Sequence, residues 1–202
     1  RIAGTPIKGM VPHRIVGLGL GRKFQAASVF ETMSVADCLR IARSGRDKPS
    51  VLRSGAALNL PAAARSVVEA SGLDTRFDED ARNLSHGLKQ ALELAMVLAL
   101  EPDLVLLDEP TAGLTRSERN VFATILTRLV EQDRLCVLIV EHDLDFVRQI
   151  SSRIVVLHQG KLVLDGTVDE VVNSPVVAEI YSGHQVADHP APAPTDTPEA
   201  RA

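Results

Sequence analysis

The sequence predicts an α/β domain with a mainly parallel sheet. Residues 104–107 and 136–140 are short, uninterrupted apolar runs, which are typical of buried parallel strands. Segments with apolar residues at helical spacing lie between and around these runs, and strands that alternate with helices indicate a parallel sheet. Because such sheets bind ligands at the carboxyl ends of their strands, a functional site is expected at that edge.

Local capping signals place the ends of the helices. Ser34, Thr115 and Thr167 are each followed three residues later by an acidic residue, as at the first turn of a helix. Gly72 has the position of a glycine that ends a helix. The elements expected, in order, are a helix at 11–17, a strand at 18–25, helices at 34–42, 63–71 and 88–100, a strand at 104–107, a helix at 115–132, a strand at 136–140, a helix at 143–150, a hairpin of 154–157 with 161–164, and a short helix after 167.

The composition disfavours some classes of function. The 202 residues hold 22 Lys and Arg against 26 Asp and Glu, a net charge of −4, which argues against a general nucleic-acid-binding protein. Aromatic residues make up 3% and Trp is absent, so there are too few rings for a platform on which bases stack. No run of 18 apolar residues predicts a membrane span. Cys38 and Cys136 lie in apolar runs and are expected to be reduced core residues.

Acidic residues and a histidine follow the two apolar runs. Asp108 and Glu109 end the first run, and His142 follows the second, so parallel strands would bring them to one rim of the sheet. One of two adjacent carboxylates could hold a hard cation such as Mg²⁺ through water, and the other could orient or deprotonate an attacking water. The alternatives are a solvated strand end and a structural histidine.

Two further places offer polar groups at the ends of elements. Ser85 and Gly87 precede a predicted helix, where a hydroxyl and free backbone N–H groups can bind an anion. The alternative is that Ser85 is an ordinary N-cap. Gln25 ends the first predicted strand, and taken alone it is equally consistent with a surface amide.

Together these residues stand in the order and at the spacings of five motifs of a known family. Over residues 1 to about 185 the chain resembles the nucleotide-binding subunits of ATP-binding cassette (ABC) transporters. Gln25 matches the Q-loop, LSHGLKQ (84–90) the signature motif, LVLLDEP (104–110) the Walker B motif, AGLT (112–115) the D-loop and His142 the switch histidine.

Smaller features resemble one branch of that family, the branched-chain amino acid and urea importers. They are the segment HRIVGLGLGRKFQ, the LSHG–K-Q form of the signature and YSG near residue 181. The separation of about 60 residues between Gln25 and Ser85 favours the urea type, because the insert of the amino-acid type is usually longer.

The resemblance implies a RecA-like P-loop NTPase core with a helical signature subdomain, and ATP and Mg²⁺ as ligands. Glu109 would act as the general base, and His142 would contact the γ-phosphate. Asp108 and Gln25 would bind Mg²⁺, largely through water. The implied division is 1–25 for the core up to the Q-loop, 26–95 for the helical subdomain, 96–185 for the rest of the core, and 186–202 for a disordered Pro-rich tail.

The resemblance also implies partners. Two ATPase subunits, identical or different, would pair head to tail, so that Ser85 and Gly87 bind the γ-phosphate of a nucleotide held by the other subunit. The pair would serve transmembrane permease subunits at the cytoplasmic face of the inner membrane. Val29, Phe30 and Met33 are candidates for the groove that receives a permease, or for plain core packing.

One family motif is missing from the 202 residues, the Walker A loop G-x-x-x-x-G-K-[ST]. The glycines of residues 17–24 are misspaced, and Phe24 stands where a hydroxyl belongs. Since residue 1 is Arg and not Met, we expect the loop to lie before residue 1, and these residues to be a truncated subunit that does not hydrolyse ATP alone.

Two motif positions depart from the family's pattern. His86 replaces the second glycine of the signature, which varies among the importers resembled here, and Thr115 replaces the Asp that usually ends the D-loop. We expect Thr115 to act mainly as a helix N-cap. Two other functions stay open, a non-catalytic ABC-fold interaction module and a non-transport ABC ATPase. The first fits the missing Walker A, and the second would need coiled-coil arms or basic patches, which the sequence does not show.

Overall fold

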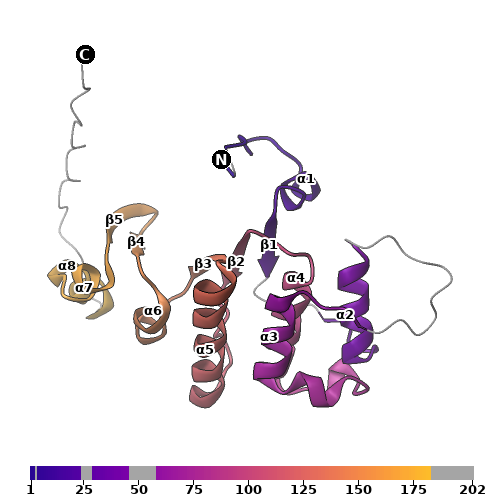
Figure 1. Ribbon diagram of the computed structural model, residues 1–202. Helices are drawn as coiled ribbons and strands as arrows, with labels where there is room; N and C mark the ends of the chain where they lie inside the picture. The colour runs from indigo at the N-terminus through magenta and orange to yellow at the C-terminus, as the bar shows by residue number, and fades with distance from the viewer. Residues whose placement is uncertain (3, 24–28, 46–57, 183–202) are drawn as a thin grey trace. The chain divides into compact units, whose positions relative to one another are not determined.

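The computed structural model describes residues 1–2, 4–23, 29–45 and 58–182 (Figure 1). The chain divides into two compact units, residues 1–146 and 147–202. Gln25 and the segment 186–202 lie outside the described residues. Among the described residues, no helix is long and apolar enough to cross a membrane.

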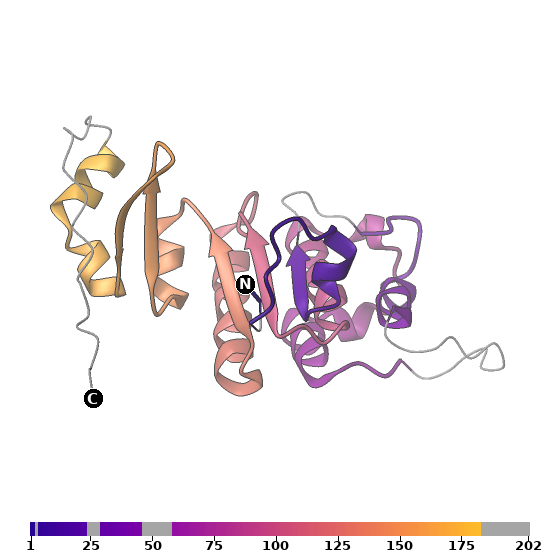
Figure 2. The same cartoon turned by 90° about the horizontal axis from the view of Figure 1, so that it is seen from above.

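The first unit contains a parallel sheet, as predicted. Its strands β1 (Leu20–Lys23), β2 (Leu104–Asp108) and β3 (Cys136–Val140) lie in the order β1-β2-β3 and all run in the same direction (Figure 2). The apolar run of β2 therefore occupies the centre, where strands pair on both sides. The register pairs Lys23 with Leu107 and Asp108 with Val140, so the strands end at one rim.

The two faces of this sheet differ in burial. Val105 and Leu107 are buried, on the face that carries Gly21, whose Cα hydrogen points at the Val97 side chain of α4 (His86–Leu98). On the other face, Leu138 and Val140 are 58% and 61% exposed. The prediction that 136–140 is a buried strand was therefore wrong: residues 136, 138 and 140 are exposed, and residues 137 and 139 are only half-buried. The residues of a strand point alternately to opposite faces, and an apolar run alone does not show whether both faces are covered.

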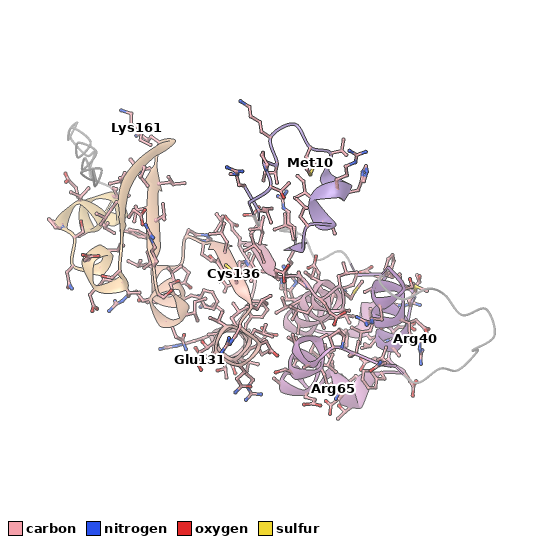
Figure 3. The ribbon with its side chains drawn as sticks, turned by 45° about the horizontal axis from the view of Figure 1, so that its top comes forward. Met10, Arg40, Arg65, Glu131, Cys136 and Lys161 are labelled. Carbon is pink, nitrogen blue, oxygen red and sulfur yellow. The ribbon has the colours of Figure 1, made fainter. Side chains whose placement is uncertain are left out.

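The same alternation corrects the prediction for one cysteine. Cys38 is buried, as expected, but Cys136 is exposed (Figure 3). Cys136 pairs in register with Leu104 and lies at the start of β3, on the same face as Leu138. Its position on that exposed face, and not its apolar neighbours in sequence, decides its accessibility.

Capped helices pack beside the sheet. Helix α2 (Val35–Ser44) follows Ser34, whose hydroxyl accepts from the Asp37 N–H at 3.1 Å, and α3 (Ala62–Ser71) ends at Gly72 with φ +77°. Helix α5 (Arg116–Asp133) begins with the predicted capping box of Thr115 and Glu118. Contacts join α3 to α4 and α5, α2 to α4, α4 to β1, and α5 to β3. The fully buried side chains of this layer include Leu39, Val67, Leu92, Leu94, Leu98 and Leu129.

Several short elements connect these helices and strands. Helix α1 (Pro12–Val16) precedes β1, and α6 (Leu144–Ile150) follows β3. Two 3₁₀ turns, η1 (Leu73–Arg76) and η2 (Ala81–Asn83), lie between α3 and α4 and were not anticipated from the sequence. Such turns have no apolar periodicity that would reveal them.

The second unit is built on the predicted hairpin. Strands β4 (Ile154–His158) and β5 (Lys161–Gly166) pair antiparallel, and α7 (Val168–Val172) begins with the capping box of Thr167 and Glu170. Helix α8 (Pro175–Ser182) is an element that the sequence pattern did not indicate. Ile154, Val171 and Val177 form the buried cluster of this unit.

Candidate functional site

The central strand ends in the two predicted carboxylates. Asp108 is the last residue of β2, and its side chain is 42% exposed with the Arg22 guanidinium 4.0 Å away. Glu109 has φ +44°, and its N–H donates to the Val140 carbonyl at 2.9 Å. A positive φ is unusual for a side chain of this kind and is often found where function requires a strained backbone. The pairing with β3 holds Glu109 in this conformation.

His142 lies at the same rim, as the sequence predicted. Its Nδ1 is 3.7 Å from Oε1 of Glu109 and 3.7 Å from Oε2 of Glu141. The imidazole is 76% exposed, and the Glu109 carboxylate is 35% exposed. A carboxylate and a histidine that are both accessible and this close can act on one substrate at the end of the sheet.

Glu141 holds the loops of this rim together. In the sequence, its neighbour His142 was singled out and Glu141 was not identified. Its side chain is fully buried. It accepts hydrogen bonds from the Thr111 N–H at 3.0 Å, from the Thr111 hydroxyl and from the His142 N–H at 3.1 Å. A buried carboxylate is tolerated when donors satisfy it. Glu141 therefore joins Thr111, in the turn after Glu109, to the backbone of His142.

A second carboxylate ties the rim to α5. Asp143 accepts from the Phe146 N–H at 3.1 Å and forms a short ion pair with Arg119. The Phe146 N–H, followed by the Arg119 guanidinium, holds the pKa of Asp143 below its usual value, against the opposing effect of burial. His142 is thus flanked by two anchored carboxylates, Glu141 and Asp143.

A buried ion pair lies behind the rim. Lys23 on β1 is 3.3 Å from Oε2 of Glu93 on α4, and their side chains are 0% and 7% exposed. Burial lowers the pKa of Lys23, while Glu93 and then Asp108 act in the opposite direction. The pair connects the strand that leads toward Gln25 with the helix that follows the signature residues. No local pattern reveals it, because its members are far apart in the sequence.

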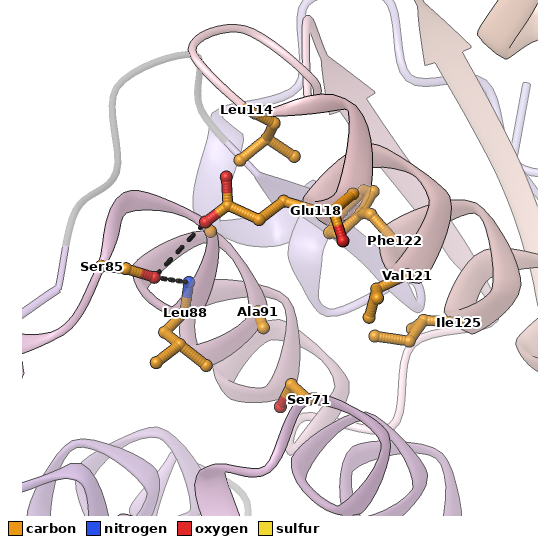
Figure 4. A pocket seen from close by; sticks show the side chains of 11 residues that line it. Ser71, Ser85, Leu88, Ala91, Leu114, Glu118, Val121, Phe122 and Ile125 are labelled. Atoms are coloured by element: carbon orange, nitrogen blue, oxygen red, sulfur yellow. Dashed lines mark hydrogen bonds between the residues drawn. The ribbon is translucent and has the colours of Figure 1, made fainter.

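Ser85 and Gly87 lie at the start of α4. The Ser85 hydroxyl accepts from the Leu88 N–H at 3.3 Å, so Ser85 is an N-cap, which was the alternative to an anion-binding role. Both residues line a pocket of about 180 Å³ between α4 and α5 (Figure 4). Glu118 and Phe122 of α5 form its opposite side. The site thus has two parts: the rim with Asp108, Glu109 and His142, and the α4 terminus in contact with α5.

The donor set at the rim suits a hard cation. Within the described ranges, no group of three or more His, Cys, Asp or Glu is arranged to hold a metal. Mg²⁺ is usually held by one or two carboxylates together with waters and substrate phosphates. The accessible Asp108 carboxylate at the strand end fits that mode of binding.

A comparison with protein families decides the identity. The family model described as ABC transporter matches residues 2–112. The chain belongs to the ABC transporter ATPase family. The matched residues include Ser85, Gly87, Asp108 and Glu109 but not His142.

Relatives of this ABC ATPase support the assignment over most of its length. The high-affinity branched-chain amino acid transport ATP-binding protein BraF of Pseudomonas aeruginosa is 30% identical over 193 residues, 91% of this chain and 75% of that protein. LivG of Salmonella typhimurium is 31% identical over 186 residues, 88% of this chain and 72% of that protein. A probable LivG of Archaeoglobus fulgidus is 34% identical over 191 residues, which are 90% of this chain and 72% of that protein.

Solved structures show the same fold. An ATP-binding cassette of an ABC transporter in its ADP conformation superposes with a TM-score of 0.68 at 24% identity, over 86% of this chain and 72% of that one. A dimeric ATP-binding cassette bound to ADP and Pi superposes with a TM-score of 0.69 at 20% identity, over 83% of this chain and 72% of that one. The predicted RecA-like core with a parallel sheet is thereby confirmed.

Proposed function

We propose that this ABC ATPase is the ATP-binding subunit of an importer for branched-chain amino acids. The observation that carries the proposal is the meeting of Glu109 and His142 at the rim of the sheet, 3.7 Å apart. The similarity to BraF and LivG supports the choice of solute. The sequence also resembled the urea type, and urea is therefore the solute against which the proposal is tested.

Glu109 is the general base in this proposal, and His142 binds the γ-phosphate and holds the attack geometry. The positive φ of Glu109 turns its side chain away from the course of β2, and its accessible carboxylate can orient a water. Phosphoryl transfer depends mainly on positioning and on neutralisation of charge. The hydrogen bonds of Glu141 and Asp143, the residues on either side of His142, hold His142 in position.

Asp108 holds Mg²⁺ through water, together with Gln25, which lies outside the described residues. When bound, Mg²⁺ neutralises charge on the phosphates. Asp108 is well placed because it ends the central strand, one residue before the base. Arg22, 4.0 Å from the same carboxylate, is a cation that can help to hold it in place.

Ser85 and Gly87 bind the γ-phosphate of a nucleotide held by a second ATPase subunit. A hydroxyl and an N–H at the start of a 13-residue helix form an arrangement that attracts anions. The Walker A motif that would hold this nucleotide is not among the 202 residues.

The subunit works with permease subunits at the cytoplasmic face of the inner membrane. Phe30 is 45% exposed, and Val29 and Met33 are half-buried. These exposures support a docking groove for a permease at this place more than they support core packing. We further propose the division at residues 25, 95 and 185, which places α2, α3 and most of α4 in the helical part; α4 contacts both α2 and α3.

Uptake by cells tests the proposal. In the organism that encodes the chain, the gene is deleted, and the uptake of labelled leucine and labelled urea is measured. Complementation uses the wild type, Glu109→Gln and Glu131→Gln, a matched change at an exposed position of α5 (Figure 3). We expect leucine uptake to be lost, and to be restored by the wild type and Glu131→Gln only.

Each other outcome contradicts a specific part of the proposal. Loss of urea uptake alone would show that the solute is wrong. Full rescue by Glu109→Gln would indicate a non-catalytic interaction module. Unchanged uptake of both solutes would exclude an importer for either of them.

A further inference from the structure

Three consecutive signature residues contact the D-loop and the start of α5 within the same chain. The Ser85 hydroxyl donates to Oε1 of Glu118 at 3.4 Å, and the same carboxylate lies against Gly87, where a Cβ atom would be 2.5 Å from that oxygen. Nε2 of His86 lies 3.0 Å from the Ala112 carbonyl. We call this set of contacts the signature latch, formed by Ser85, His86, Gly87, Ala112 and Glu118.

Of the two departures from the family's motif pattern, His86 belongs to the latch, and Thr115 orients the Glu118 side chain of the latch. A carbonyl oxygen only accepts, so Nε2 of His86 carries the proton that it shares with Ala112. Thr115 orients Glu118, because its N–H and its hydroxyl donate to Oε2 at 2.9 and 2.8 Å. The capping box thus aims the other carboxylate oxygen of Glu118 at the signature.

The Glu118 carboxylate lies directly on the backbone of the signature. A Cβ atom at Gly87 would be 2.5 Å from Oε1 of Glu118, so the approach requires a glycine there. The positive end of the α4 dipole favours an anion at this position. Hydrogen bonds from Thr115, and with smaller effect from Gly87 and Ser85, keep the pKa of Glu118 below its usual value.

We infer that Glu118 is an internal competitor for the donors that receive the partner's γ-phosphate. The inference rests on the proposed function of Ser85 and Gly87. Each N–H and each hydroxyl has one proton to donate, and a carboxylate beside an incoming phosphate adds repulsion between like charges. Glu118 must therefore withdraw from the signature before ATP is bound between two subunits.

The experiment measures the ATPase rate against ATP concentration in the purified transporter that contains the chain. Glu118→Gln keeps the size of the side chain and an oxygen for the Thr115 donors, but removes the charge. We expect its KM for ATP to fall about tenfold, since one such repulsion is worth about that factor. Thr115→Ala, which frees Glu118 without altering it, is expected to lower KM in the same direction. Glu131→Gln on the exposed side of α5 is the matched control.

Ser85→Ala separates this inference from the proposed function. We expect it to raise KM, because it removes a donor to the phosphate. If Ser85→Ala raises KM while Glu118→Gln leaves KM unchanged or raises it, the competitor is excluded and the signature role stands. If Ser85→Ala has no effect on KM, the signature role fails, and the competitor with it.

Discussion

Nδ1 of His142 lies 3.7 Å from Oε1 of Glu109, although the two residues end different strands. The register that pairs Asp108 with Val140 brings these strand ends together. The Glu109 N–H, bonded to the Val140 carbonyl, holds the turn after β2 against β3. The proposed base and the proposed phosphate-binding histidine therefore come together because of sheet pairing, and their contact depends on the groups that fix the two loops.

The first prediction concerns turnover by the 202 residues alone. We expect phosphate release from ATP to be no faster than for the Glu109→Gln variant, because the residues contain no Walker A loop to hold the nucleotide. Phosphate released by both proteins is measured at saturating ATP. Measurable turnover that Glu109→Gln abolishes would contradict the prediction. It would show that the 202 residues bind and hydrolyse ATP without a Walker A loop.

The second prediction concerns Glu141 as a positioning residue. Glutamine at this place can accept from Thr111, but its NH₂ group then faces the His142 N–H, and a donor is left unsatisfied. Such a loss costs about 1–3 kcal/mol, so we expect kcat of the assembled transporter to fall about tenfold or more with little change in KM. Steady-state kinetics of Glu141→Gln test this.

Two further variants act as controls for Glu141. Glu69→Gln changes an exposed residue of α3 and should leave kcat unchanged. Glu141→Asp retains the charge and should recover part of the rate. A rise in KM for ATP with unchanged kcat would assign Glu141 to nucleotide binding, contrary to the prediction.

The third prediction concerns the buried pair of Lys23 and Glu93. Lys23→Met leaves the Glu93 carboxylate buried without its cation, which costs about 3–5 kcal/mol. The double variant Lys23→Met, Glu93→Leu replaces both charges by apolar groups and should recover most of the stability. The free energy of unfolding in urea measures both. A double variant as unstable as the sum of its single variants would show that the two residues do not interact.

The fourth prediction concerns the pH dependence of stability. The folded-state pKa of Asp143 lies below its usual value of 3.8. Its contribution is therefore present in full above pH 3.8 and is lost as the pH falls through the folded-state pKa. Asp143→Asn should destabilise the chain by about 1 kcal/mol at pH 7, the usual worth of a charge at a helix N-terminus.

The difference between wild type and Asp143→Asn should vanish in strong acid. Chemical unfolding at a series of pH values measures it. Asp78→Asn, which changes an exposed residue in the turn between η1 and η2, is the matched control and should change little. A difference that stays constant down to pH 2 would mean that the charge of Asp143 makes no contribution.

Local signals predicted much of the fold. Ser34, Thr115 and Thr167 were predicted to cap helices. In the structure each of their side chains accepts a hydrogen bond from the N–H three residues later. The apolar run before Asp108 is the central strand. These features could be predicted because the interacting groups are near neighbours in sequence.

Long-range contacts could not be predicted in this way. Glu118 reaches the signature 33 residues before it, and Glu141 reaches Thr111 across 30 residues. The pattern of apolar residues does not encode which side chains two loops present to each other. Cys136 shows the same limit, because its exposure depends on which face of the sheet is covered.

By itself, the sequence determined the order of the elements, the helix caps and the motif residues at the strand ends, since backbone hydrogen bonds and apolar periodicity act over a few residues. Only the tertiary structure decided that Glu109 meets His142, that the buried Glu141 accepts from Thr111, and that Glu118 lies on Gly87. Those contacts depend on the register of the sheet and on the packing of α4 against α5, and distant residues determine them together.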